Sequence, residues 1–264
     1  MKRNTVFWGA ILILVGALLL LDNLNILPFS VWGLLWPLLL IAAGVWVLLG
    51  VSGSRRSVEA QQVSIPLEGE PAARIKLSHG AGELLVKGGA APGYLLSGTF
   101  NGGVEYRSTR EAGRQIVKLK SPLVFVAPWD MFSRNARLWS VELNGDIPLS
   151  LEIESGASST RIDLTGVKLT DLELEVGASS ADVSLPAGAG RTRVKIEAGA
   201  AAVTLRLPPQ AEARVRYEGG LSSLNIDRAR FAQSGNSYQT AGFDAATDRL
   251  DIDIESGVGS VTIL

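Results

Sequence analysis

The segment LEIESGASS at residues 151–159 recurs as LELEVGASS at residues 172–180, and this near-repetition decides the fold. In both copies, apolar and charged residues alternate up to a glycine, and small residues follow it. The same arrangement surrounds five glycines, which are Gly156, Gly177, Gly199, Gly220 and Gly257. The first three intervals between them are 21, 22 and 21 residues, and the last is 37. A nearly fixed period of this size is typical of stacked supersecondary repeats.

Positions at equal distances from these glycines carry the same chemistry. The residues three before each glycine are apolar, namely Ile153, Leu174, Ile196, Tyr217 and Ile254. The residues two before each glycine are glutamates, namely Glu154, Glu175, Glu197, Glu218 and Glu255. Alternation with a period of two predicts strands that bury one face and expose the other.

Each repeat is therefore expected to be a strand, a tight glycine corner, a second strand and a looser corner. We expect the glycine to supply a backbone conformation that other residues resist, and the small residues to let neighbouring coils approach. Two short strands bury too little apolar surface alone, so the repeats must stack over a shared interior. This predicts an all-β domain of the β-solenoid type over residues 63–264, with an ordinary β-sandwich as the alternative. The long last interval is interpreted as the same repeat plus an inserted loop from about Arg228 to Arg249.

The residues upstream of the repeats also have strand character. The segment IKLSHG at residues 75–80 resembles a degenerate first repeat with serine at the glutamate position. Further strands are expected at residues 94–100, 104–108, 115–120 and 138–144. The intervening segment 121–137 is too apolar for a solvated loop, so we expect it to cap one end of the stack.

The N-terminal region has a different solvent preference. Residues 7–21 and 31–51 are two runs without charge, each about long enough to cross a hydrocarbon layer of ~30 Å as a helix. They predict a two-helix transmembrane hairpin over residues 1–51, followed by a linker over 52–62. A cleaved signal peptide is the alternative for the first run, but no small-x-small cleavage site follows it.

Basic residues flank the hairpin on its outer ends only. Lys2 and Arg3 precede the first run, Arg55 and Arg56 follow the second, and the connecting turn has no Lys or Arg. The positive-inside rule then places both ends, and with them the β domain, in the cytoplasm. The prediction is a multi-pass protein of the bacterial inner membrane that contacts lipid through two spans.

Composition and motifs argue against several classes of function. The chain has 264 residues, a net charge of −1 and no cysteine, so it has no basic field for nucleic acid and no thiolate metal ligands. His79 is the only histidine, and no Gly-x-Ser-x-Gly elbow or Walker-type phosphate loop occurs. We predict no enzymatic activity, no catalytic or metal-binding residues and no cofactor.

The five glutamates are the one candidate site. If consecutive coils stack in register, four of them, Glu154, Glu175, Glu197 and Glu218, stand about 4.8 Å apart along one face. The residues two positions earlier are mixed in charge, and Lys195 and Arg216 among them could neutralise part of the acidic ladder diagonally. The ladder is interpreted as a surface for a cation or a protein partner, or alternatively as an ordinary solvated face. The five glycines are assigned a structural role.

Two parts of the chain resemble a known group of proteins. The segments LLLDNL at residues 19–24 and WPLLLIAAG at 36–44, with Gly9 and Gly16, resemble the transmembrane region shared by LiaI and LiaF-like proteins. The repeats at 151–159 and 172–180 are similar to the C-terminal toastrack domain of that group. The resemblance implies a bacterial membrane protein of cell-envelope stress signalling, which acts on a membrane histidine kinase and not as an enzyme. LiaF-type regulators usually have more than two spans, so this chain departs from them.

The resulting hypothesis is a non-enzymatic regulator or sensor accessory that works through protein–protein contacts. Its expected partners are a membrane sensor kinase or a second copy of the chain, and no nucleic acid. One alternative is a self-associating scaffold whose interface includes residues 129–132. Another is an extracytoplasmic module that binds the envelope, should the topology be reversed. A carbohydrate-active enzyme is the weakest alternative, because the acids form an outward ladder and do not face each other across a cleft.

Overall fold

The structure, a computed structural model, describes residues 36–37, 40–41, 44–45, 60–122 and 138–264. The chain divides into two compact units, Met1–Ser57 and Val58–Leu264. In the first unit the six described residues are helical. Within the described part of the chain, no helix has the length and apolar character needed to span a membrane. The predicted two-span hairpin lies outside the described residues, apart from those six.

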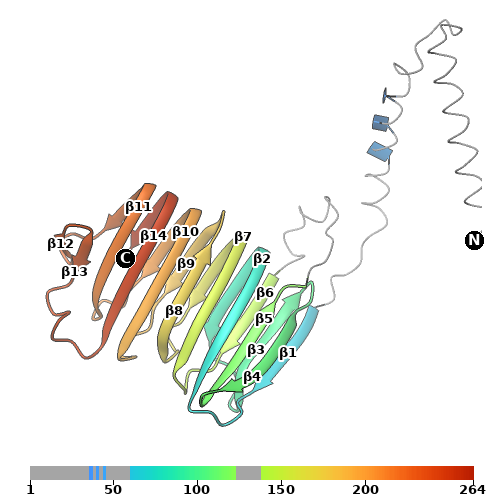
Figure 1. Ribbon diagram of the computed structural model, residues 1–264, viewed down its shortest axis with the longest axis horizontal. Coiled ribbons are helices and arrows are strands. Elements are labelled where there is room, and N and C mark those ends of the chain that lie inside the picture. The colour runs from blue at the N-terminus through green and yellow to red at the C-terminus, as the bar shows by residue number, and fades with distance from the viewer. Residues whose placement is uncertain (1–35, 38–39, 42–43, 46–59, 123–137) are drawn as a thin grey trace, which may run out of the picture. The chain divides into compact units, whose positions relative to one another are not determined.

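The second unit is all-β, as predicted, and its strands join into one hydrogen-bonded system (Figure 1). In chain order these are β1 (Ala60–Pro66), β2 (Ala72–Gly88), β3 (Tyr94–Asn101), β4 (Glu105–Glu111), β5 (Arg114–Lys120), β6 (Leu138–Leu143), β7 (Leu149–Asp163), β8 (Leu169–Val176), β9 (Ser180–Ser184), β10 (Arg191–Arg206), β11 (Glu212–Ile226), β12 (Ala232–Ser234), β13 (Ser237–Gln239) and β14 (Arg249–Ile263). The four upstream strands lie close to their predicted positions. The degenerate first repeat is real, because β2 pairs in parallel with β7 and sets Ser78 opposite Glu154.

The repeats form a stack of parallel coils. Each coil bends at its glycine corner into a first and a second half, and the halves of neighbouring coils pair separately. The first half of β7 pairs with β8 and its second half with β9, and β10 then continues both pairings. Inward residues of both halves, such as Ile153 and Ile162 on β7, belong to one buried apolar core. The two halves therefore make two layers around a shared interior.

The order of the coils departs from the order of the sequence. The parallel stack runs β2, β7, β8 with β9, β10, β14, β11, so the last strand of the chain lies between β10 and β11 (Figure 1). The expectation that consecutive coils stack in the order of the sequence is wrong at this point. Residues between β11 and β14 do include the expected insertion, which forms β12 and β13, and β13 pairs antiparallel with Arg214–Arg216 of β11.

Charge explains why β14 occupies this place. On the outward face, Arg193 and Lys195 of β10 would stand beside Arg214 and Arg216 of β11 if those strands were neighbours. With β14 between them, Asp251 is in register with Arg193 and Arg214, and Asp253 with Lys195 and Arg216. Like charges directly opposite each other destabilise a sheet and opposite charges stabilise it. The acidic strand is thus favoured between the two basic ones.

The corner glycines lie above one another in the same order, and we call them the glycine column. Its members are Gly80, Gly156, Gly177, Gly199, Gly257 and Gly220. A Cβ added at Gly257 would lie 2.7 Å from the carbonyl oxygen of Gly199, and one at Gly177 would lie 2.9 Å from that of Gly156. Such separations are shorter than real Cβ contacts, so a larger residue would force the coils apart.

Our expectation about these corners was therefore half wrong. Among the five glycines of the repeats none has a positive φ, so they do not supply a conformation reserved for glycine. They are required because the backbone of the next coil lies directly against them. The corner carbonyls also accept hydrogen bonds from that coil, as in the 2.9 Å bond from Ala200 N to Gly177 O.

The two ends of the stack are built differently. At the β2 end, the first halves continue into β5 and the antiparallel β4, and the second halves continue into β6, β3 and β1. At the β11 end, the β12–β13 hairpin covers the first-half layer, and Phe231, Tyr238 and Phe243 are buried there. The predicted cap over residues 121–137 lies outside the described residues except at 121 and 122.

Candidate functional site

The five predicted glutamates form one row on the outer face of the first-half layer. Strand register places them as direct neighbours, and we call this set the glutamate row: Glu154, Glu175, Glu197, Glu255 and Glu218. The order differs from the prediction, because Glu255 stands between Glu197 and Glu218. The correction follows from the insertion of β14 and leaves five carboxylates on five adjacent strands.

At the β2 end, Lys76 neutralises the start of the row. Its ammonium group donates hydrogen bonds to Glu152 at 2.6 Å and to Glu154, and the Ser78 hydroxyl donates to Glu154 at 2.8 Å. The hydrogen bonds from Lys76 and Ser78 hold the pKa of Glu154 below its ordinary value. Burial opposes the ionisation of Glu152, but the hydrogen bonds from Lys76 and Arg74 outweigh it and lower the pKa of that carboxyl too. The same bonds raise the pKa of Lys76.

In the middle of the row, Lys195 pairs along its own strand. Its ammonium group donates to Glu197, two residues further on, and this hydrogen bond raises the pKa of Lys195. Arg216 donates to Asp253 at 2.7 Å and also reaches Asp251. Lys195 therefore neutralises one member of the row, but along its own strand and not diagonally. The expectation is wrong for Arg216, which pairs with Asp253 and Asp251 of β14.

Three members of the row stay exposed and carry no ion pair among the described residues: Glu175, Glu255 and Glu218. They lie on β8, β14 and β11, so carboxylates without an ion pair stand on both sides of Glu197 in the row. In the described part of the chain, no three His, Cys, Asp or Glu groups are placed so that they could hold a metal ion. A row of flat, solvent-facing carboxylates suits contact with a basic surface better than chelation of one cation.

Asp251 is a charged residue that the sequence reasoning missed. Its side chain is only 8% exposed and lies within 3.5 Å of three guanidinium groups, those of Arg191, Arg214 and Arg216. Burial opposes its ionisation, but the hydrogen bond from Arg214 and the charges of Arg214 and Arg216 hold its pKa below the ordinary value. The signal was present in the sequence, because the residue six before the glycine is charged in the four later repeats, namely Asp171, Arg193, Arg214 and Asp251.

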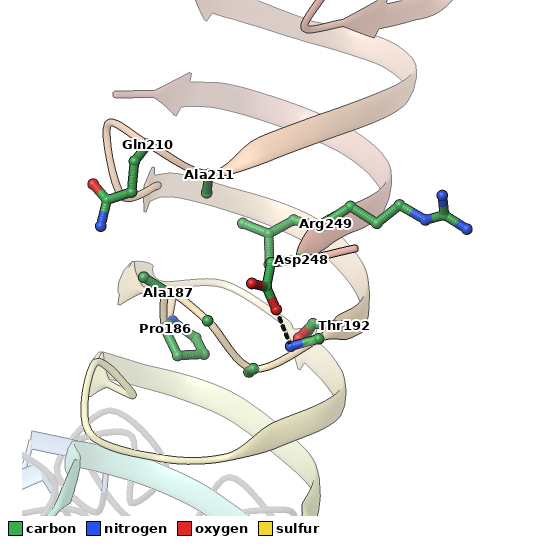
Figure 2. Close-up of a pocket in the computed structure, with 11 residues that line it drawn as sticks. Pro186, Ala187, Thr192, Gln210, Ala211, Asp248 and Arg249 are labelled. Carbon is green, nitrogen blue, oxygen red and sulfur yellow. Dashed lines mark hydrogen bonds between the residues drawn. The ribbon is translucent and has the colours of Figure 1, made fainter. Parts of the chain in front are cut away.

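A pocket of about 310 Å³ opens beside the loop between β9 and β10. Figure 2 shows Pro186 and Ala187 on one side, Gln210 on another, and Asp248 next to the loop. The Asp248 carboxylate accepts a hydrogen bond from Gly190 N at 2.8 Å, and the Arg249 side chain extends away from the loop (Figure 2). The polar groups that line the pocket do not converge on a common point. We therefore interpret the pocket as a space between loops and not as a ligand site.

His79 lies in the core. It is 2% exposed, and its ring centroid is 5.0 Å from that of Trp139, which in turn meets Phe100 edge to face. This position makes it part of the packing at the β2 end of the stack.

Known proteins match the chain in two regions. Residues 6–48 match the LiaI-LiaF-like transmembrane region, and residues 54–206 match the N-terminal domain of toast_rack, DUF2154. No curated protein matches the chain.

Among solved structures, a proposed cell adhesion protein from Clostridium sporogenes is similar in fold. It has a TM-score of 0.70 at 20% identity, over 78% of this chain and 99% of that one. A proposed adhesin from Bacteroides fragilis aligns over 80% of this chain and 98% of its own at 6% identity, and its TM-score of 0.21 supports no inference.

The match at the N-terminal end implies membrane anchoring, which agrees with the two apolar runs. The match over residues 54–206 covers more than half of the sequence. The matched residues include β2 to β10, where the coils stack in the order of the sequence. The chain thus belongs to the toast-rack family, with a LiaI-LiaF-like membrane region at its N-terminal end.

Proposed function

We propose that this protein is a membrane-anchored regulator of cell-envelope stress signalling that acts through protein–protein contacts. One observation carries the proposal: a LiaI-LiaF-like membrane region and a toast-rack domain occur together in one chain. The site supports it, because the outer face offers an extended charged surface, whereas the described pocket has no convergent polar groups. Extended faces of stacked repeats suit docking of a protein partner.

The proposed docking surface is the part of the glutamate row that runs from β8 to β11. Glu175, Glu255 and Glu218 have no ion pair among the described residues, so a basic segment of a membrane sensor kinase is the expected partner. Complementary charge speeds encounter and selects the partner more than it adds affinity. Binding should accordingly weaken as the salt concentration rises.

Partner capture tests this surface. The full chain, purified from membranes of stressed cells, should bring down a sensor kinase, and Glu175→Gln combined with Glu255→Gln should lose most of it. The matched control is Glu105→Gln combined with Glu111→Gln, which removes two exposed charges from β4 at the far end of the same layer. Equal capture by both double variants would exclude the glutamate row as the docking surface, and absence of any signalling protein would count against the regulator itself.

Membrane topology is the second requirement, and we propose that the β domain is cytoplasmic because Lys2, Arg3, Arg55 and Arg56 flank the two apolar runs. The chain has no cysteine, so Ser180→Cys, at an exposed position of β9, would be the only thiol. A membrane-impermeant thiol reagent should label it only after the cells are permeabilised.

Labelling in intact cells would instead favour an envelope-binding module outside the membrane. The C. sporogenes protein of similar fold is described as a proposed cell adhesion protein, which gives this second function a specific precedent at the level of fold alone. The same thiol experiment separates the two proposals.

A further inference from the structure

The outer face of the first-half layer carries a cluster of positive charge at the β2 end of the stack. Three exposed side chains form it, and we call them the basic patch: Arg107 of β4, and Lys118 and Lys120 of β5. Antiparallel register sets Arg107 directly opposite Lys118, and parallel register sets Lys118 beside Lys76 of β2. Cations therefore stand side by side on three adjacent strands.

The basic patch has no ion pair among the described residues. Lys76 donates to Glu152 at 2.6 Å, on the side of β2 away from Lys118, so that carboxylate does not offset the patch. Glu105 is opposite Lys120 in register, but no ion pair joins the two. Like charges directly opposite each other destabilise a sheet, so this arrangement costs stability unless an anion lies against it.

The basic patch lies at the end of the domain where the chain arrives from the membrane region. β1 begins at Ala60, and the side-chain oxygen of Gln61 accepts a hydrogen bond at 3.0 Å from Val104 N, directly before β4. Nine residues of chain lead from residue 51, the end of the second apolar run, to Ala60. An extended chain of this length spans at most about 32 Å. A short segment thus connects the start of β1, and with it the start of β4, to the membrane.

We propose that the basic patch docks on anionic lipid headgroups of the membrane in which the chain is anchored. Ammonium and guanidinium groups donate hydrogen bonds to phosphate oxygens, and their attraction to an anionic surface falls off within about 10 Å. The short connection raises the effective concentration of the patch at that surface. Arg55 and Arg56, which lie in the connection, add to the same attraction. The inference rests on membrane anchoring and not on the signalling role.

The same face has the opposite charge toward its other end. Glu175, Glu255 and Glu218 lie on β8, β14 and β11, whereas β5 and β4 follow on the other side of β2 (Figure 1). An anionic surface attracts the basic patch and repels the glutamate row. Docking through the basic patch therefore turns the glutamate row away from lipid and leaves it accessible to a protein partner.

Fluorescence quenching of the full chain in vesicles tests the docking. Thr109→Cys, exposed on the same side of β4 as Arg107, carries a fluorophore, and the quencher is attached to lipid headgroups. The vesicles are either phosphatidylcholine alone or a mixture of phosphatidylcholine and phosphatidylglycerol in both leaflets, so the direction of insertion does not matter. Quenching should be strong in the mixed vesicles, weak in the neutral ones, and reduced by added salt. The matched reporter Ala232→Cys, exposed on β12 at the other end of the layer, should be quenched weakly in both.

Charge variants identify the cations responsible. Each Lys or Arg near an anionic surface changes the docking equilibrium about fivefold, so Arg107→Gln combined with Lys118→Gln should weaken docking about 30-fold and remove most of the quenching. Urea unfolding should show no loss of stability, because the variant removes two like charges that oppose each other. The matched control is Arg161→Gln combined with Arg228→Gln, which removes two exposed cations that also have no ion pair among the described residues.

Three results would overturn the proposal. Equal quenching of the Thr109→Cys label in the two kinds of vesicle would exclude anionic headgroups as the occupant, and weak quenching in both would favour an acidic protein segment instead. Retained quenching in the Arg107 and Lys118 double variant would exclude the basic patch. An equal loss of quenching in the Arg161 and Arg228 control would show that net charge, and not this patch, decides the docking.

Discussion

The absence of a Cβ atom at the corner glycines allows the close spacing of the coils. At the glycine column the carbonyl oxygen of one coil occupies the space where a Cβ of the next would lie, and the outward ion pairs sit on strands held at that spacing. Sequence reasoning found the glycines and their period but assigned the wrong cause, because a required glycine looks the same whether it serves a backbone angle or a close approach. Only the position of the neighbouring coil separates the two.

Gly257→Ala should destabilise the β domain, because the new methyl would lie 2.7 Å from Gly199 O. We expect a loss of about 1 to 3 kcal/mol in the free energy of unfolding, as for other overpacked sites. Gly80→Ala is the control: it lies in the same column, but nothing lies within 4 Å of its added Cβ. Urea denaturation of both variants measures the difference, and equal losses would contradict close approach as the reason for the column.

Asp251→Asn should cost about 1 to 2 kcal/mol at neutral pH, because it leaves Arg191, Arg214 and Arg216 without their shared carboxylate. The cost is below that of a fully buried pair because the arginines reach solvent. The pKa of Asp251 is lowered in the folded state, so its stabilisation is present above the ordinary aspartate pKa and is lost as the pH falls through the folded value. Unfolding curves should therefore separate the variant from the natural chain at pH 7 and converge in strong acid.

At the level of elements, sequence alone predicted most strands but not their neighbours. Alternation located the strands and aligned the columns, since both are properties of residues within one repeat. The order β10, β14, β11 depends on which repeats are neighbours in space. The repeat period of the sequence does not indicate which repeats are neighbours. The charges of Arg193, Arg214 and Asp251 did contain it, because two basic strands need an acidic one between them.

The place of β14 can be tested by exchanging charges. Asp253→Arg and Arg216→Asp should each destabilise the domain, and the double variant should recover part of the loss. The expected coupling is about 0.5 to 1 kcal/mol, the range for a partly exposed pair with two parallel hydrogen bonds. The control is the same exchange at Arg206 and Asp182, which join β10 to β9 and should give coupling without involving β14. A double variant no better than the worse single one would argue against the electrostatic account of strand order.

At the scale of the whole molecule, the inserted strand makes the last coils interdependent. In a simple array of repeats, removal of the last one leaves the others folded. Here, a chain that stops after residue 228 lacks β14, so Arg214 and Arg216 lose their acidic neighbours and β10 becomes an open edge. We expect β11 to be unfolded in this truncated chain.

Hydrogen exchange measures this outcome. Amides of β11 should lose their protection in the truncated chain, whereas those of β7 and β8 should keep it, because their partners on both sides remain. Protected β11 amides would show that β11 can stack directly on β10, contrary to the expectation.

The position of β14 also has a consequence for timing during synthesis. The ribosome delivers β11 before β14, and the further residues take roughly two to seven seconds at ordinary elongation rates. During that interval β10 and β11 have both been synthesised. Repulsion between the outward arginines and lysine of the two strands disfavours direct pairing of β10 with β11. β14 can insert between β10 and β11 only after Asp251 and Asp253 have been synthesised. The last coil of the chain therefore completes the stack from within and not at its end.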